Sequence, residues 1–196
     1  QVPAELYREF MEDMVAEIDR ENVIISDLLS LVKMDKKASK LEIAAVDINE
    51  LLQIIMKRLK PIASQRNIEL IFESFRPVTA EIDEVKLTLA FSNLIENGIK
   101  YNIDDGWVRV TLNADHKYFY VKVADSGVGI PEDCQDQVFD RFYRVDKARS
   151  RDTGGTGLGL AITQSAILMH KGEIRLYSKP GEGTTFTLRI PLKYNA

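Results

Sequence analysis

The chain has 196 residues, of which 45% are hydrophobic, 29% are charged and 8% are aromatic, and its formal net charge is −4. This length suffices for one well-filled core with a smaller appendage, and the acidic balance argues against nucleic acid as a main partner. The single cysteine, Cys134, excludes an internal disulfide framework and a zinc site built from several cysteines. No apolar run reaches about 18 residues, so we expect no membrane span, and the opening QVPAELYREF lacks the apolar region of a signal peptide.

The first third of the sequence predicts one long helix. Its apolar residues follow alternating steps of four and three for about four heptads, interrupted only at Glu21. Members of this series are Tyr7, Met11, Met14, Ile18, Ile25, Leu28 and Val32. Neighbouring apolar residues widen the stripe beyond a two-stranded seam, which favours a four-helix bundle. The alternative is a helix that packs on its own globular domain.

Beyond a charged stretch at residues 34–40, which we interpret as a hinge, helical and strand-like segments are mixed. Helices are expected at about residues 49–63, at about 83–102 and at 157–170. Asp83 is a plausible N-cap for the second of these helices. The expected strands are LEIAAVDI, NIELIFE, RPVTAEI, GWVRVTL, YFYVKVAD, EIRLYS and TTFTLRIPL. Because the order lacks strict βαβ alternation, it predicts an α+β fold, a two-layer α/β sandwich preceded by a long helix.

The helix containing LAFSNLIENGIKYN carries an unusual polar stripe opposite its apolar one. Asn93, Asn97, Lys100 and Tyr101 fall on this stripe at i, i+4, i+7 and i+8. A solvated helix face is the ordinary explanation. However, two carboxamides, a cation and a flat ring are also the groups that a Mg²⁺–triphosphate with an adenine base requires.

Two glycine-rich segments follow. In YVKVADSGVGIP a strand ends at Asp125, and Gly127 and Gly129 follow it. A carboxylate therefore lies where a flat ligand could approach the turn. The alternative is an ordinary turn capped by Asp125, which would have the same sequence pattern. In GGTGLGLAI a glycine cluster runs into a helix, an arrangement that presents backbone N–H groups to phosphate. This segment is neither a Walker A loop nor a dinucleotide fingerprint. The basic stretch VFDRFYRVDKARSRDTGG before it suits a mobile lid, or simply a charged surface loop.

The order of these segments is more specific than any one of them. The Asn-rich helix, DSGVGIP, FDRFYR, GTGLGLAI and GEGTTF resemble the N, G1, F, G2 and G3 boxes of sensor histidine kinases, which have the Bergerat-type ATP-binding fold of the wider GHKL group. The resemblance covers residues 41–192, and residues 5–35 look like the second helix of the dimerisation and phosphotransfer hairpin. It implies a partial dimerisation and phosphotransfer region at 1–37, a hinge and first strand at 38–46, and an ATP-binding catalytic domain at 47–196.

The resemblance also implies roles for individual residues. Asn97 is similar to the Mg²⁺ ligand, supported by Asn93, and Asp125 to the acceptor of a hydrogen bond from the adenine amino group. For the phosphates, the resemblance implies contacts from Lys100, Arg144, Gly155, Thr156, Gly157 and Gly159. For the base and its pocket, it implies contacts from Tyr101, Gly127, Gly129, Ile130, Leu158 and Thr184. The lid between Phe142 and Gly155 is expected to be mobile without nucleotide.

The reaction that the resemblance implies is transfer of the γ-phosphoryl group of ATP, with Mg²⁺, to a histidine, and onward to an aspartate of a response regulator. The family's acceptor motif, H-E/D-x-R/K, is absent, and neither His116 nor His170 looks like an acceptor. The acceptor helix of the parent kinase would therefore act in cis or in trans, with a homodimer possible and no nucleic acid partner. We expect a cytoplasmic domain of a parent anchored in the bacterial inner membrane.

Two other functions are compatible with these motifs. ATP hydrolases of the same fold carry E-x-x-x-N, but here Asn93 stands in place of that glutamate, and Glu96 points about 100° away around the helix. A degenerate nucleotide sensor, which binds without phosphoryl transfer, is the second alternative.

Overall fold

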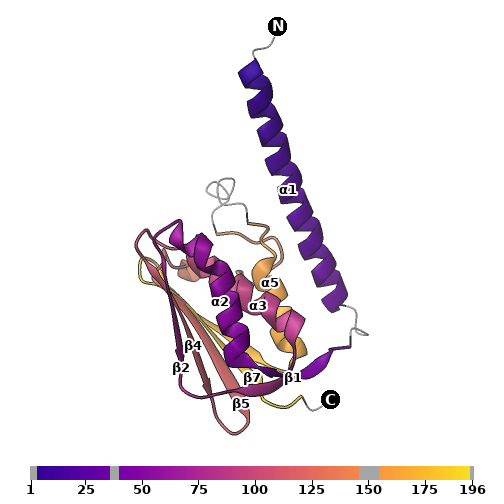
Figure 1. Cartoon of the computed structure of the whole chain (residues 1–196), viewed down its shortest axis with the longest axis vertical. Helices are drawn as coiled ribbons and strands as arrows, with labels where there is room; N and C mark the ends of the chain where they lie inside the picture. The colour runs from indigo at the N-terminus through magenta and orange to yellow at the C-terminus, as the bar shows by residue number, and fades with distance from the viewer. Residues whose placement is uncertain (1–3, 36–39, 146–154, 195–196) are drawn as a thin grey trace.

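The computed structural model describes residues 4–35, 40–145 and 155–194. A long helix, α1 (Ala4–Asp35), precedes a domain in which helices α2, α3 and α5 lie on one side of a sheet (Figure 1). The helices of this domain are α2 (Ile48–Ser64), α3 (Glu84–Lys100) and α5 (Gly159–Met169), with a short 3₁₀ turn η1 (Glu132–Cys134). No helix among the described residues is both long and apolar enough to cross a membrane.

The described residues include seven strands in two sheets. They are β1 (Ile43–Asp47), β2 (Glu69–Ser74), β3 (Thr79–Asp83), β4 (Trp107–Ala114), β5 (Tyr118–Asp125), β6 (Glu173–Lys179) and β7 (Gly183–Pro191). The larger sheet has the order β2-β4-β5-β7-β6, in which only the β2–β4 pair is parallel, and β1 pairs with β3 in a separate ribbon. Alternate residues of the central strands are buried beneath the helices, so the predicted two-layer α/β sandwich is confirmed.

The apolar stripes predicted for α2 and α3 are the faces that these helices bury. On α3 the buried residues include Leu87, Phe91, Leu94 and Ile95, while the polar stripe stays at least partly exposed. Asp83 is the N-cap, as predicted, because its Oδ1 accepts a hydrogen bond from the Lys86 N–H at 3.1 Å.

Helix α5 begins two residues later than the sequence predicted. Gly157 has a φ of +72°, outside the helical region, so the helix starts at Gly159. The predicted hinge at residues 34–40 falls largely outside the described residues, and β1 starts at Ile43.

Helix α1 uses its apolar residues in two ways. Near its C-terminal end, Leu31 is 2% exposed and forms a small buried cluster with Leu158, Ala161 and Ile162 at the start of α5. Toward the N-terminus, Tyr7, Met11 and Ile18 are all more than half exposed. The C-terminal end of α1 therefore packs on the domain of its own chain, which is the alternative considered from the sequence. For the rest of α1, packing in a four-helix bundle stays a prediction.

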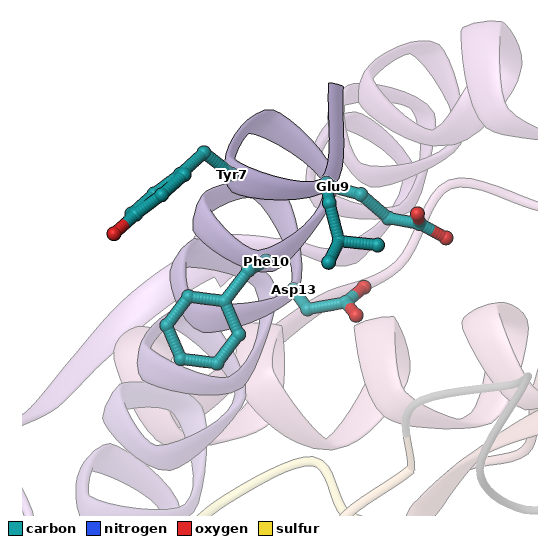
Figure 2. A pocket seen from close by; sticks show the side chains of 5 residues that line it. Tyr7, Glu9, Phe10 and Asp13 are labelled. Atoms are coloured by element: carbon teal, nitrogen blue, oxygen red, sulfur yellow. The ribbon is translucent and has the colours of Figure 1, made fainter. Parts of the chain in front are cut away.

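The exposed part of α1 also contains a shallow open depression of about 450 Å³. It is lined by Leu6, Tyr7, Glu9, Phe10 and Asp13. In Figure 2, Tyr7 and Phe10 project to one side of the helix and Glu9 and Asp13 to the other. Because one helix alone lines it, this depression is a helix surface rather than an enclosed ligand site.

Candidate active site

One side of the candidate site is built around the carboxylate of Asp125, which ends β5. Its Oδ1 accepts two backbone hydrogen bonds, from Gly127 N at 2.8 Å and from Thr184 N at 3.2 Å. Burial raises the pKa of Asp125 to about 6, although these two hydrogen bonds favour the charged form. Both bonds use the same oxygen, so Oδ2 has no hydrogen-bond partner among the described residues. The carboxylate is thus held in one orientation with a second oxygen available to a ligand.

The turn after Asp125 is packed closely against α3 and against the β6–β7 turn. A Cβ on Gly127 would lie 2.4 Å from the carbonyl oxygen of Tyr101, so no side chain fits there. Gly129 has a φ of +72°, and a Cβ there would meet Lys179 O at 2.1 Å. The N–H of Ile130 donates to Ser178 Oγ at 2.8 Å. These residues therefore form the wall of the site rather than a loose loop.

Two further contacts place neighbouring elements against Asp125. Thr184 of β7 pairs directly with Asp125 across the sheet, is 8% exposed, and shares a 2.9 Å hydrogen bond with Ser178. On α3, a Cβ on Gly98 would lie 3.4 Å from the Cβ of Asp125. Since Gly98 follows Asn97 directly, the predicted metal ligand and the predicted adenine acceptor lie on adjoining elements, α3 and β5.

On the other side of the site, two cations and a phenol converge at Gly155. A Cβ on Gly155 would lie 2.7 Å from Lys100 Nζ, 3.3 Å from the Tyr101 hydroxyl oxygen and 3.6 Å from Arg144 Nη2. Burial, together with the positive charge of Arg144, lowers the pKa of Lys100 to about 8, and Glu96 opposes this shift. Two like charges that approach a glycine backbone in partial burial favour an anionic ligand such as a phosphate chain.

The segment that follows Gly155 is tied to its neighbours by specific hydrogen bonds. Phe142 N–H donates to Gly157 O at 2.9 Å, so the FDRFYR segment contacts the glycine loop directly. Thr156 Oγ1 accepts from Leu158 N at 3.2 Å and donates to Asp27 Oδ2 on α1 at 2.6 Å. The predicted lid between Phe142 and Gly155 lies mainly outside the described residues, which end at 145 and resume at 155.

The two asparagines of α3 occupy different environments. Asn93 Nδ2 donates to Gly159 O at 3.1 Å, which joins α3 to the first residue of α5. The half-buried Asn97 side chain makes no hydrogen bond to any described residue. No group of three or more His, Cys, Asp or Glu in the described part of the chain could hold a metal. Mg²⁺ needs few protein ligands when phosphate and water oxygens complete its shell, so an available amide oxygen at Asn97 fits this ion.

Three predicted or considered residues lie away from this centre. Leu158 is fully buried in the cluster with Leu31 of α1, and its nucleotide contact stays a prediction. His170 is also buried: Nε2 accepts from Asp83 N at 2.9 Å and Nδ1 donates to Ala166 O at 2.7 Å. Burial lowers the pKa of His170, consistent with a neutral structural imidazole. His116 is exposed in the turn between β4 and β5.

The sequence did not single out the polar residues that hold these elements together. Asn102, just beyond α3, is 5% exposed, and its side chain bonds to both α3 and the Ser126 hydroxyl. Arg66, in the turn after α2, donates to the carbonyl oxygens of Ile99 and Lys100 at the end of α3. A polar residue between two unrelated segments leaves no periodic signal, so only the three-dimensional arrangement identifies it.

Comparison with known proteins identifies the family to which this chain belongs. Residues 82–194 match the family described as histidine kinase-, DNA gyrase B-, and HSP90-like ATPase. The chain is 39% identical over 184 residues to the sensor-like histidine kinase SenX3 of Mycolicibacterium smegmatis. It is 38% identical over 185 residues to the sensor histidine kinase WalK of Bacillus subtilis. These alignments include 94% and 92% of this chain, but the chain spans only 48% and 30% of the two relatives.

A solved structure extends the similarity to the long helix. Full-length ShkA in complex with AMPPNP aligns with the whole of this chain and with 41% of its own, at a TM-score of 0.83 and 27% identity. The family match covers more than half of the residues. The chain therefore belongs to the histidine kinase-, DNA gyrase B- and HSP90-like ATPase family and is homologous to the ATP-binding catalytic domains of sensor histidine kinases.

Proposed function

We propose that this chain binds ATP with Mg²⁺ at the site described and donates the γ-phosphoryl group to a histidine of its parent kinase. The observation that carries the proposal is the pairing of two features in one site. Asp125 offers an oriented carboxylate oxygen at one end, and Lys100 and Arg144 converge on Gly155 at the other. The similarity to ShkA, whose structure holds AMPPNP, supports an adenine nucleotide.

Within this proposal each group has a defined task. Asp125 Oδ2 accepts a hydrogen bond from the adenine amino group, Tyr101 packs on the base, and Thr184, Gly127, Gly129 and Ile130 shape the pocket. Lys100 and Arg144 hold the phosphates together with Gly155, Thr156, Gly157 and Gly159. Asn97 is the protein ligand of Mg²⁺, and Asn93 supports the metal site while joining α3 to α5. When bound, the metal neutralises part of the phosphate charge.

The reaction is an in-line displacement at the γ-phosphorus. An imidazole nitrogen forms a bond to phosphorus while the bond to the bridging oxygen breaks, and ADP leaves with the electron pair. Lys100 and Arg144 stabilise the negative charge on the transferred group and the leaving oxygen, so these residues contribute through position and charge. The second ring nitrogen of the acceptor loses its proton to solvent or to a neighbouring base.

Partners and setting follow from the same proposal. The acceptor histidine lies on a helix of the parent kinase and is reached in cis or in trans, and a response regulator takes the phosphoryl group from it. Residues 1–37 form part of a dimerisation and phosphotransfer region, 38–46 a hinge and first strand, and 47–196 the catalytic domain. The parent is a two-component sensor kinase anchored in the bacterial inner membrane, with this part in the cytoplasm.

The test is phosphoryl transfer in trans. The chain is incubated with γ-labelled ATP, Mg²⁺ and the separate acceptor hairpin of a related sensor kinase, and a hairpin whose histidine is replaced by glutamine serves as the control. Acid-labile, alkali-stable label on the intact hairpin alone supports the proposal. ATP binding by calorimetry without any label on the hairpin would instead favour the nucleotide sensor.

The ATP hydrolase is disfavoured by the chemistry of α3. Asn93, which occupies the position of the hydrolase base, is an amide engaged with Gly159 O and cannot accept a proton at neutral pH. Glu96 is the nearest carboxylate on the helix, and its pKa is raised by burial, which Arg58 and Lys100 oppose. Steady ATP turnover by the chain that is lost in a Glu96→Gln variant would restore the hydrolase.

A further inference from the structure

The end of α3 is joined to the turn after Asp125 by a buried set of hydrogen bonds around Asn102. Asn102 Nδ2 donates to Gly98 O at 2.8 Å and to Trp107 O at 3.0 Å. Its Oδ1 accepts from Ile103 N and from Ser126 Oγ, each at 3.0 Å. All the ordinary donor and acceptor positions of one carboxamide are therefore used, in a side chain that is 5% exposed.

This network reaches both sides of the base pocket. Gly98 belongs to α3, while Ser126 immediately follows the carboxylate of Asp125. The Ser126 hydroxyl also accepts from Trp107 N at 2.8 Å, which ties the start of β4 to the same point. A Cβ on Gly106 would lie 2.2 Å from Asn102 Oδ1 and 2.6 Å from Ser126 Oγ, so the Gly106 backbone packs directly against the network and no side chain fits there.

The backbone repeats the same connection one residue away. Tyr101 O accepts from Val128 N at 3.1 Å, so two consecutive residues at the end of α3 bind two residues of the turn after Asp125. From the opposite side, the Arg66 guanidinium donates to Ile99 O, Lys100 O and Asn102 O at 2.8, 2.6 and 3.1 Å. The last turn of α3 is thus fixed in translation and in rotation relative to β5.

We propose that Asn102 is a positioning residue for nucleotide selection, which sets the distance between the adenine-stacking Tyr101 on α3 and the adenine acceptor Asp125 on β5. This inference rests on the proposed binding of ATP at the site. Without the Asn102 bridge, the Tyr101–Val128 backbone bond is the one hydrogen bond that remains between the end of α3 and the Asp125 turn among the described residues, beside the close packing at Gly98 and Gly127. The Asp125 carboxylate then no longer has a fixed position relative to the base, and its discrimination between an amino group and a carbonyl on the purine falls.

The structure also supplies a matched control. Asn49, near the start of α2, is a similar bridge: its Oδ1 accepts from Val78 N at 2.8 Å and its Nδ2 donates to Ser74 Oγ at 2.6 Å. It joins α2 to the β2–β3 connection and contacts none of the site residues. Asn49→Ala therefore removes a bridging carboxamide with a comparable loss of hydrogen bonds but leaves the site intact.

The experiment compares Asn102→Ala, Ser126→Ala and Asn49→Ala in the whole chain. Calorimetry gives the Kd for Mg–ATP and Mg–GTP, thermal unfolding gives the stability, and amide hydrogen exchange without nucleotide follows Gly127 and Val128. We expect Asn102→Ala to weaken ATP binding about tenfold and to reduce the ATP-to-GTP preference by a similar factor. Exchange at Gly127 and Val128 should accelerate, and Ser126→Ala should produce smaller changes of the same kind. Asn49→Ala should lower stability alone.

Each outcome bears on one of the two proposals. If both Asn102→Ala and Ser126→Ala resemble Asn49→Ala in nucleotide preference and in exchange, Asn102 has no positioning role. If Asn102→Ala does not fold, Ser126→Ala decides by the same two measurements. If the unaltered chain binds no ATP, the proposed function fails. The exchange data then separate the two proposals, because they report whether Asn102 holds the Asp125 turn without any ligand.

Discussion

The two sides of the site are built in opposite ways. Around Asp125 most polar atoms are paired within the protein: Oδ1 of the carboxylate accepts two backbone N–H groups while Oδ2 is left for a ligand, and the Asn102 carboxamide is fully hydrogen-bonded. Around Gly155, by contrast, Lys100 and Arg144 bring like charges together, and the pKa of Lys100 falls to about 8. One side is organised by internal hydrogen bonds and the other by a concentration of positive charge.

This difference separates selectivity from affinity. A group held by two hydrogen bonds with one free position distinguishes a donor from an acceptor on the ligand. Converging cations attract any polyphosphate, whatever base it carries. We therefore expect changes near Gly155 and at the proposed metal ligand to alter affinity for all nucleotides alike, and changes near Asp125 to alter which nucleotide is preferred.

The largest expected effect is loss of Asn97, the proposed metal ligand. Replacing Asn97 with alanine should weaken Mg²⁺-dependent binding of both ATP and GTP by roughly a hundredfold, because the described residues contain no group of three or more His, Cys, Asp or Glu that could hold the ion instead. Calorimetry with and without Mg²⁺ measures this effect. Asn113→Ala, which removes an exposed carboxamide at the end of β4, is the control. Unchanged Mg²⁺-dependent affinity in Asn97→Ala would assign the metal to another ligand.

A smaller loss of affinity, but a change in selectivity, is expected for Asp125→Asn. The asparagine Oδ1 keeps the two backbone N–H bonds, so an NH₂ group takes the place of Oδ2. That group faces the adenine amino group donor to donor, but it complements the O6 acceptor of guanine. We expect ATP affinity to fall about tenfold and GTP affinity to rise, measured by paired titrations. A retained preference for ATP would mean that Asp125 does not contact the base.

The pH dependence of ATP affinity should show both sides of the site at once. In the proposed site the carboxylate form of Asp125 accepts a hydrogen bond from the adenine amino group, so ATP affinity should decline as pH falls through the Asp125 pKa of about 6. The proposed phosphate contact needs the charged form of Lys100, so ATP affinity should also decline as pH rises through the Lys100 pKa of about 8. The plot of ATP affinity against pH therefore has an acid limb and an alkaline limb. Far from the pKa, affinity along each limb changes by about tenfold per pH unit.

Variants assign each limb to its residue. In Asp125→Asn the acid limb attributable to the protein should disappear, and what remains reports protonation of the nucleotide itself. In Lys100→Arg the alkaline limb should move to higher pH, because a guanidinium stays charged there. An alkaline limb that persists unchanged in Lys100→Arg would contradict the role given to Lys100.

The same contrast explains what the sequence predicted and what it did not. The strands and the two faces of α3 were predictable because alternation and 3.6-residue periodicity reflect burial directly. The apolar stripe of α1 predicted one buried face but not its partner: Leu31 packs on α5, while Tyr7 remains exposed. Periodicity reports that a face is apolar and carries no information about which surface covers it.

The hydrogen bonds that position the site were not predictable by these means. Asn102 and Ser126 are 24 residues apart in the chain, and Asp27 and Thr156 are 129 apart. Local propensity describes a polar residue after a helix as a turn former, and nothing in the sequence pairs it with a distant hydroxyl. Such distant pairs hold both the Asp125 turn and the glycine-rich loop in place, so the arrangement of both required the structure.

The smallest expected effect is at Gly98, where α3 passes closest to Asp125. Gly98→Ala gains helix propensity of up to about 1 kcal/mol, but the added Cβ would lie 3.2 Å from both methyl groups of Val108. We expect the free energy of unfolding to rise by less than about 1 kcal/mol because Val108 must shift slightly.

The ATP-to-GTP preference should not change, since the new methyl group approaches the Cβ of Asp125 at 3.4 Å rather than its free oxygen. Denaturant unfolding measures the first quantity. A marked loss of stability in Gly98→Ala, or an altered ATP-to-GTP preference, would show that the contact between α3 and β5 tolerates no displacement. The rigidity inferred at Asn102 would then also apply to the face of α3 that contains Gly98.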